Sequence, residues 1–463
     1  MVDIQEQKEF ELLKETKDIV LTNNLDNPIV KELDTLLNEM LKESTTEPFT
    51  TITTFGKIAA KRIHVVNFSK LNCGCKRKEI FEKIASLKED TVVLVDTFKN
   101  DRYQLNMQDL SETILTKNYS YDVLKSKKET KDKNFNYYGE SKIYDSVKKG
   151  YVLGESINAC RDLVNAPYNY LNATDLATHA KALERLDNVS VEIINKKEIE
   201  KMNMGAFLGV NKGSIDEPKL IYIKYQGKDD FEDPVALVGK GVMYDTGGYS
   251  LKTPVSMPGM KVDMAGSAAV ISAIQAIASL KLEANVMAIV AATDNRIGDG
   301  AIVPDDVLTA ANGKTIEIVS TDAEGRLTLA DAVWFAQEKG SKKVIDIATL
   351  TGAMVMALGK EFTGAFTNNK EFYSEFVKAT DKTKEKVWEM PITKGYHKEL
   401  KSNVADMKNK GGRTAGASQA AAFIENFINK DTAWIHLDVA GTAANKDGGT
   451  GVMVKTFTEL FCK

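Results

Sequence analysis

The most constraining feature of this sequence is the alternation, from residue 219 onward, of short apolar runs with longer segments of helical periodicity. The apolar runs predict buried strands, and apolar residues that recur at helical spacing predict amphipathic helices. Strands that alternate with helices are typical of an α/β fold, so we expect a central mixed sheet flanked by helices. The predicted strands are residues 219–225, 234–239, 286–292, 315–319 and 343–348, and the predicted helices are residues 265–280 and 327–338.

The chain is long enough for more than one domain. Its 463 residues exceed what one ordinary core accommodates, and its character changes near residue 150. We expect a smaller N-terminal α/β domain over residues 1–145, a linking helix over residues 146–170, and a larger C-terminal α/β domain over residues 171–463. Pro167 is expected to stop the linking helix.

Composition places the chain among soluble globular proteins, with 43% apolar and 27% charged residues. A formal charge of −4 is nearly balanced for this length, so no whole-molecule attraction to nucleic acid or acidic lipid is expected. The N-terminus lacks the basic-then-apolar pattern of a signal peptide, and no apolar run is expected to cross a membrane. These features favour a cytoplasmic protein without membrane or nucleic-acid partners.

Cysteine and histidine are sparse. Cys73 and Cys75 are too close in sequence for an easy disulfide and have no second pair for a zinc knuckle, so the cysteines are expected to be reduced thiols. The histidines are dispersed and none belongs to an HExxH pattern, which excludes a thermolysin-like zinc site. Any bound metal must therefore be held mainly by oxygen.

Charged residues gather at the predicted carboxyl ends of strands, where α/β folds bind ligands. Glycines at 241, 247 and 248 surround one of these carboxylates and allow backbone conformations that other residues resist. The group comprises the carboxylates Asp245, Asp263, Asp322 and Glu324 and the cations Lys240, Lys252 and Arg326.

Each of these residues alone has a simpler interpretation, as an acid at a helix N-terminus or as a surface cation. Together they would place several carboxylates in an apolar, Ala- and Gly-rich setting, which is unfavourable unless they are neutralised. Two divalent ions suit four carboxylates, so the residues alone predict a two-metal hydrolase. A two-metal phosphohydrolase remains an alternative, although the sequence has no GxxxxGK[ST] phosphate-binding loop.

Three motifs give this cluster a family resemblance. Residues 320–327 read STDAEGRL, which matches seven of the eight positions of NTDAEGRL, residues 239–252 match GKGxxxDxGGxSxK, and residues 260–266 match MKxDMxG. With these motifs the chain resembles the leucyl aminopeptidase (cytosol aminopeptidase) family of metallopeptidases. The resemblance covers residues 150–463 and is weak over residues 1–140. Further matching segments are residues 348–353, 402–406, 416–423 and 434–441.

The resemblance implies two divalent metal ions, Mn²⁺ or Zn²⁺, in each subunit. The matching motif positions imply that Lys252 would stabilise the developing oxyanion. They also imply that Arg326 would position a bicarbonate ion that serves as the general base. One metal site would use Lys240, Asp245, Asp263 and Glu324, and the other would use Asp245, Asp322 and Glu324.

The resemblance also implies a substrate and an assembly. The expected activity is release of N-terminal residues, preferentially leucine and other apolar residues, from peptides, because one ion would hold the free α-amine. Met260, Thr349 and Gly352 match positions that line the side-chain pocket, with plain core packing as the alternative. A homohexamer is implied, with an oligomerisation or regulatory role for the N-terminal domain. An added DNA-binding role is a further alternative, which the near-neutral charge supports little.

Three positions depart from the family pattern. Ser320 replaces the asparagine of the octapeptide, Asp294 begins a run DNRI in place of ENM, and Asp305 stands where glycine is common. None of these departures removes a metal ligand or a catalytic cation, so they bear on side-chain preference rather than on hydrolysis.

Overall fold

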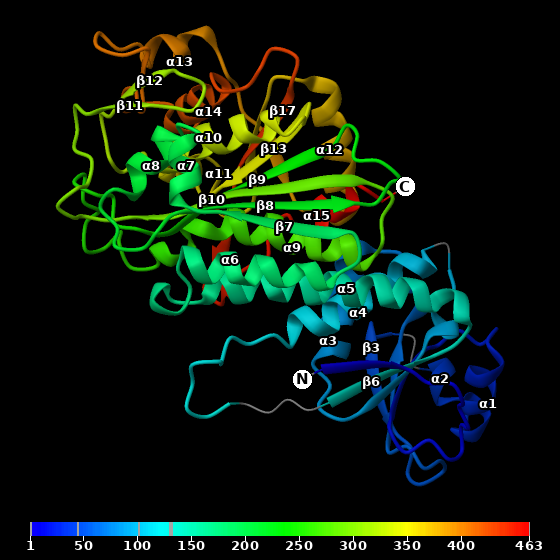
Figure 1. Cartoon of the computed structure of the whole chain (residues 1–463). Coiled ribbons are helices and arrows are strands. Elements are labelled where there is room, and N and C mark those ends of the chain that lie inside the picture. Colours follow the sequence, from blue (N-terminus) through cyan, green and yellow to red (C-terminus); the bar gives the residue numbers. More distant parts are fainter. Residues whose placement is uncertain (1, 44–45, 101, 129–132, 463) are drawn as a thin grey trace. The chain divides into compact units, whose positions relative to one another are not determined.

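The structure is a computed structural model that describes residues 2–43, 46–100, 102–128 and 133–462. The chain forms two compact units, residues 1–158 and 159–463, and helix α5 (Ser141–Asn165) runs from the first unit into the second. Each unit contains a sheet flanked by helices (Figure 1), which confirms the predicted α/β class. The domain boundaries near residues 145 and 170 stay predictions.

The smaller unit is built on a six-stranded sheet in the order β1-β6-β5-β2-β4-β3. All neighbouring strands are parallel except β3 and β4. Side chains of successive strand residues alternate between two cores: Val20 packs on one face with Phe81, whereas Ile19 and Leu21 pack on the other with Leu33. The strands are β1 (Val2–Glu6), β2 (Asp18–Thr22), β3 (Phe49–Thr53), β4 (Arg62–Val66), β5 (Thr91–Leu94) and β6 (Lys133–Tyr138), and the helices are α1 (Pro28–Leu36), α2 (Met40–Glu43), α3 (Gly74–Ala85) and α4 (Tyr103–Lys117).

The larger unit contains a mixed eight-stranded sheet in the order β15-β14-β17-β13-β9-β10-β8-β7. Its centre is parallel, since β17, β13, β9 and β10 pair in one direction, and antiparallel strands adjoin this centre on both sides. The strands are β7 (Val189–Ile194), β8 (Lys219–Gln226), β9 (Val235–Asp245), β10 (Asn285–Asn295), β13 (Lys343–Ala348), β14 (Thr363–Thr367), β15 (Val387–Glu389) and β17 (Ala433–Asp438).

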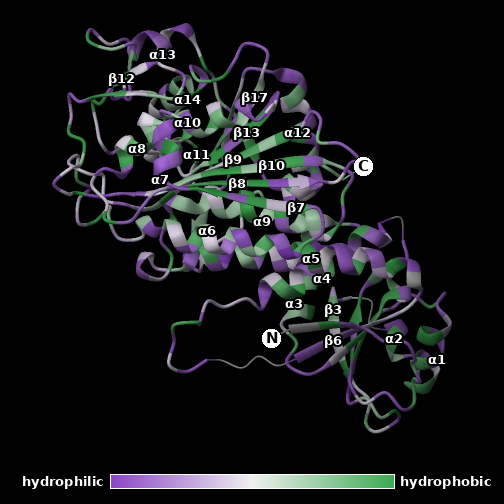
Figure 2. Ribbon diagram, viewed as in Figure 1, coloured by the Kyte–Doolittle hydropathy of each residue, from purple (hydrophilic) through white to green (hydrophobic). Residues whose placement is uncertain are grey.

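Helices cover both faces of this sheet (Figure 1). Helices α6 (Ala173–Lys181), α9 (Ala265–Ser279) and α15 (Val454–Glu459) lie on one side, and α8 (Gly205–Asn211), α10 (Gly325–Glu338) and α14 (Gly416–Glu425) lie on the other. Figure 2 shows that the central strands and α9 are mainly hydrophobic, as a sheet buried on both faces requires. The remaining helices are α7 (Lys196–Lys201), α11 (Gly352–Leu358), α12 (Lys370–Thr383) and α13 (Lys394–Glu399).

Strand β9 is longer than the sequence predicts. The predicted strand ends at Gly239, but the observed strand continues to Asp245, because pairing with β10 extends to Lys240 opposite Ala291 and Asp245 opposite Asn295. Lys240 and Asp245 therefore lie on β9 itself, beyond the strand end that the sequence predicts. The loop begins after Asp245.

The predicted strand at residues 315–319 lies outside the central sheet. Thr315–Glu317 forms β12, which pairs with β11 (Val307–Thr309) and β16 (Met407–Lys408) in a separate three-stranded sheet. Beside it, Asp305 has a positive φ of 77°. Such a backbone conformation favours glycine, which gives a physical reason for the glycine that the family pattern prefers there.

One helical stretch, Met260–Ser279, is long and apolar enough to span a membrane, contrary to the expectation from the sequence. In the structure, 83% of its apolar window is buried inside the fold, where α9 packs against β9, β10 and β13. Core packing therefore accounts for its composition.

Candidate active site

Three segments of the larger unit bring the predicted charged residues together. Strand β9 carries Lys240 and Asp245, and the loop after it carries Lys252. The 3-10 turn η5 (Met260–Met264) places Asp263 directly ahead of α9. The third segment carries Asp322 and Glu324 in the turn that leads into α10 and Arg326 in the first turn of that helix.

Lys240 lies at the centre of the cluster and is only 2% exposed. Its Nζ lies 2.6 Å from Asp263 Oδ2 and 2.9 Å from Glu324 Oε1, and it donates a hydrogen bond to the carbonyl oxygen of Thr349 at 3.1 Å. Burial alone would lower the pKa of this amine, but the surrounding carboxylates outweigh burial and raise it. Without a metal ion, Lys240 is therefore a charged ammonium.

Lys252 approaches the cluster from the more open side. Its Nζ lies 2.7 Å from Asp245 Oδ2 and contacts Asp322 Oδ1, and its side chain is 15% exposed. Burial opposes the charge of Lys252, but Asp245 and Glu324 raise its pKa above the ordinary value. A charged donor on this side of the site lies where a substrate would enter from solvent.

The cluster holds more negative charge from its carboxylates than the two lysines neutralise. Burial, followed by the negative charge of Glu324, raises the pKa of Asp245 to about 6, and burial also raises the pKa of Asp263 and Asp322. Burial likewise opposes the charge of Glu324, but Lys240 and Lys252 hold its pKa below the usual value. The site therefore favours additional positive charge.

The donor set fits divalent metal ions. Oxygen atoms of Asp245, Asp322 and Glu324 lie within 4.8 Å of one another, close enough to share an ion. The buried Oδ2 of Asp263 lies 2.6 Å from the ammonium of Lys240, and a carboxylate oxygen with one such contact retains a lone pair for a cation. Carboxylate oxygens supplemented by one amine suit hard and borderline divalent ions.

Arg326 is fully enclosed. It is 7% exposed, its Nη1 donates to the carbonyl oxygen of Asn409 at 2.9 Å, and its Nε is buried without a hydrogen-bond partner among the described residues. Burial lowers its pKa to about 10 against the opposing charge of Glu324. The unpaired donor of a buried guanidinium favours an anion beside it.

Two asparagines that the sequence analysis did not assign to the site support its loops. Asn295, at the end of β10, donates through Nδ2 to Asp245 Oδ1. Its position at a strand end is the one feature of the sequence that could have indicated a place in the site. Asn409, fully buried, donates to the carbonyl oxygens of Ser320 and Ala323 at 2.7 and 3.3 Å. No motif marked Asn409 in the sequence.

The predicted pocket residues have different surroundings. The hydroxyl of Thr349 donates to Asp263 Oδ1 at 2.9 Å, so this side chain holds a carboxylate of the cluster. Gly352 is exposed at the start of α11, and Met260 is half-buried at the start of η5. Their role in binding a substrate side chain stays a prediction.

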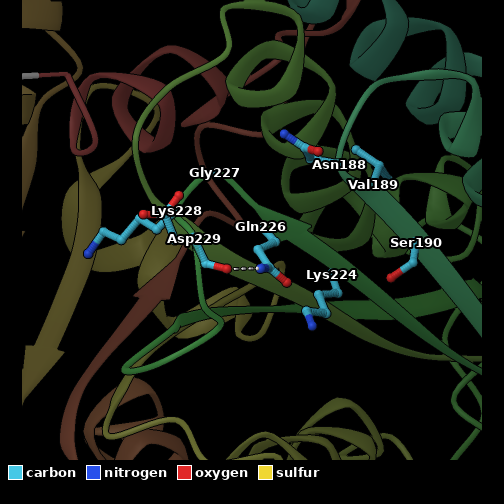
Figure 3. Close-up of a pocket in the computed structure, with 8 residues that line it drawn as sticks. All are labelled: Asn188, Val189, Ser190, Lys224, Gln226, Gly227, Lys228 and Asp229. Atoms are coloured by element: carbon cyan, nitrogen blue, oxygen red, sulfur yellow. Dashed lines mark hydrogen bonds between the residues drawn. The ribbon is translucent and has the colours of Figure 1, made fainter.

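A separate hollow of about 580 Å³ lies at the β7–β8 end of the same sheet (Figure 3). Its wall is largely polar, and the Gln226 side chain donates to the carbonyl oxygen of Asp229 at 3.0 Å. None of the predicted site residues lines it. The carboxylate cluster is thus the stronger candidate for the chemistry.

An α/β sheet that gathers carboxylates and lysines near the carboxyl ends of its central parallel strands defines a metal-dependent hydrolase. The model of the cytosol aminopeptidase family, catalytic domain, matches residues 158–458. The chain belongs to this family and is an aminopeptidase, a metal-dependent peptidase. This finding confirms the predicted family and activity and supports them over the phosphohydrolase and DNA-binding alternatives.

Individual relatives agree with this assignment. The chain is 43% identical over 389 residues to a probable cytosol aminopeptidase of Bacillus subtilis, covering 81% of this chain and 78% of that protein. It is 46% identical over 330 residues to a probable cytosol aminopeptidase of Bacillus licheniformis, covering 69% of this chain and 66% of that protein. A mutant of tomato leucine aminopeptidase has a similar structure, with a TM-score of 0.85, 29% identity, and coverage of 100% of this chain and 96% of that one.

Proposed function

We propose that this chain is a leucyl aminopeptidase that releases N-terminal leucine and other apolar residues from peptides by two-metal hydrolysis. The observation that supports it is the buried cluster in which Lys240 contacts Asp263 and Glu324 while Lys252 contacts Asp245. Two divalent ions, Mn²⁺ or Zn²⁺, would be held by Lys240, Asp245, Asp263, Asp322 and Glu324. When bound, they supply Lewis-acid polarisation of the scissile carbonyl and a water of lowered pKa.

Lys252 has the role of oxyanion stabiliser in this proposal. It is charged and more exposed than Lys240, so its ammonium is able to turn from the carboxylates toward a substrate. A positive donor aimed at developing negative charge contributes roughly 3–4 kcal/mol to transition-state stabilisation.

Arg326 has the role of anion holder. Its unpaired Nε would hold a bicarbonate ion, which would accept the proton of the attacking water as general base. This role suits a cluster whose own carboxylates are already committed to lysines and metal ions.

The test measures release of leucine from a chromogenic leucyl amide with Mn²⁺ or Zn²⁺, together with bound metal. Asp245→Ala is expected to lose metal and activity. Lys252→Ala is expected to keep its metal but lose turnover by about 10²–10³-fold, as for the loss of one oxyanion donor. Lys281→Ala, which removes an exposed lysine paired with Asp187, is the matched control and should match the wild type.

Absence of metal-dependent turnover in the wild type would refute the proposal. Equal losses in Lys252→Ala and Lys281→Ala would refute only the oxyanion role. Comparing leucyl, alanyl and lysyl amides tests the apolar preference that Met260, Thr349 and Gly352 are proposed to set.

The homohexamer and the cytoplasmic location also stay proposals. The relatives are named cytosol aminopeptidases, which supports the location. Sedimentation of the purified full chain measures the assembly, and a mass other than that of six chains would contradict the hexamer.

A further inference from the structure

Two thiols meet at the surface of the smaller unit. Cys73 and Cys75 are both exposed and unbridged, and their Sγ atoms lie 3.0 Å apart. Cys73 is the N-cap residue of α3, and Cys75 lies in the first turn of that helix. The larger unit holds the other two cysteines, Cys160, which is buried, and Cys462, which is half-buried.

Two cysteines separated by one residue do not easily form a disulfide, but the sulfur atoms of this pair are already close together. A disulfide bond is about 2.05 Å long, so the sulfur atoms have only about 1 Å left to close. The residue between them is Gly74, and a side chain there would meet no atom within 4 Å. A glycine in open space lets the backbone adjust as the bond forms.

The surroundings favour the thiolate, which is the reactive form. The Cys75 thiol and the backbone N–H of Lys76 lower the pKa of the Cys73 thiol, and the charge of Lys76 adds to this effect. The partial positive charge at the N-terminus of α3 acts in the same direction. The nearest acid along the helix, Glu79, is itself paired with Lys76 and Lys83.

We propose that Cys73 and Cys75 form a redox-active dithiol that exchanges with low-molecular-weight disulfides. The Cys73 thiolate attacks one sulfur of the small disulfide, which forms a mixed disulfide and releases one small thiolate. The Cys75 thiolate then attacks the Cys73 sulfur, which forms the Cys73–Cys75 bond and releases the second small thiolate. The small disulfide is reduced by two electrons, the protein dithiol is oxidised by two, and the two protons of the dithiol pass to the released thiolates.

The experiment uses the full chain in buffers of reduced and oxidised glutathione, followed by acid quenching and peptide mass mapping. In the wild type we expect an intrachain Cys73–Cys75 disulfide that reduced glutathione reverses. In Cys75→Ser we expect the glutathione mixed disulfide to accumulate at Cys73, because the resolving thiol is missing. Cys462→Ser is the matched control and should form the same disulfide as the wild type.

A second measurement separates reactivity from mere exposure. At neutral pH, iodoacetamide should alkylate Cys73 at least about threefold faster than Cys75, which is also exposed, as expected for a thiol of lowered pKa. Equal glutathionylation of Cys73, Cys75 and Cys462 without an intrachain bond would overturn the proposal. So would disulfides formed only between chains.

Discussion

The side-chain amide of Asn295 donates a hydrogen bond to Oδ1 of Asp245 across a distance of 2.8 Å. The same nitrogen donates to the carbonyl oxygen of Thr321 at 3.0 Å, and the main-chain carbonyl oxygen of Asn295 accepts from the backbone N–H of Thr246 at 3.0 Å. The buried side-chain amide of Asn295 therefore helps to orient Asp245, a proposed metal ligand, and ties it to the turn that carries Asp322.

Removal of this amide is expected to weaken metal binding. Asn295→Ala removes one of the hydrogen bonds that orient Asp245, although the backbone N–H of Gly247 and the ammonium of Lys252 still contact this carboxylate. Loss of a group that orients a ligand typically reduces metal affinity by about 10–100-fold. Competition with a coloured chelator measures this affinity directly, without reference to turnover.

Asn285→Ala is the matched control, because Asn285 is a buried asparagine at the other end of β10. Its Nδ2 donates to the carbonyl oxygens of Asp230 and Glu232, far along the strand from the cluster. This variant should lose stability but keep its metal affinity. If the two variants lose metal affinity equally, Asn295 acts only through the stability of the strand.

Gly325 is expected to be irreplaceable because it lies against Lys240. A Cβ at this position would stand 2.4 Å from Lys240 Cε and 2.6 Å from its Nζ, so Gly325→Ala must displace the lysine. We expect lower metal affinity and lower turnover, with a loss of stability of about 1–3 kcal/mol from overpacking. Gly395→Ala, whose added Cβ would meet only Thr393 Oγ1 at 3.4 Å, should behave as the wild type in both measurements.

The sequence predicts the charged members of the site well because they are concentrated in short motifs. Lys240, Asp245 and Lys252 lie within one run of fourteen residues that matches a family pattern, and in the structure the two lysines contact the later carboxylates. The sequence pattern nevertheless predicts that the strand ends at Gly239, because a charged residue normally marks a strand end. Here Lys240 is paired with Asp263 of η5 and Asp245 is paired with Lys252 of the loop after β9, so both charges are neutralised inside the fold.

The supporting residues could not be predicted in the same way. Asn409 reaches Ser320 across 89 positions of sequence, and no local periodicity reports such a contact. The motifs imply a pocket role for Thr349, which stays a prediction, and they do not report that its hydroxyl donates to Asp263 or that its carbonyl oxygen accepts from Lys240. The contacts of Asn409 and Thr349 depend on which strand ends lie side by side. The order of strands in the sheets decides this, and that order is a property of the tertiary structure.

Metal uptake should release protons. Carboxylates raise the pKa of Lys240, and this amine must lose its proton before it can bind a metal ion. Burial also raises the pKa of Asp245 and Asp263, so in the absence of metal these groups take up protons more readily than ordinary carboxylates do. Metal affinity is therefore expected to rise with pH.

Titration calorimetry in two buffers of different ionisation enthalpy counts the released protons. Lys240→Met should release about one proton fewer than the wild type, because the deprotonation of the amine is gone. Lys281→Met should release the same number as the wild type. An unchanged proton count in Lys240→Met would mean that Lys240 stays an ammonium in the metal-bound enzyme.

A second buried charge pair lies in the same sheet, between β13 and β17. His436 Nδ1 lies 2.5 Å from Asp346 Oδ1, and Trp434 Nε1 donates to Asp346 Oδ2 at 2.6 Å. Both members of the pair are fully buried. Burial alone would lower the pKa of His436, but Asp346 outweighs burial and raises it.

Asp346→Asn is expected to destabilise the larger unit by about 3–5 kcal/mol at pH 6, because it leaves a buried imidazolium without its counter-charge. The pKa of His436 is higher in the folded protein than in the unfolded chain. The ion pair therefore stabilises the fold fully below about pH 6.5, and this stabilisation is lost as the pH rises through the folded pKa. The difference in stability between wild type and variant should therefore shrink as the pH is raised.

Guanidinium unfolding followed by tryptophan fluorescence measures this difference, because all three tryptophans, at 334, 388 and 434, lie in the larger unit. A difference that does not change with pH would show that His436 is neutral and that Asp346 acts only as a hydrogen-bond acceptor.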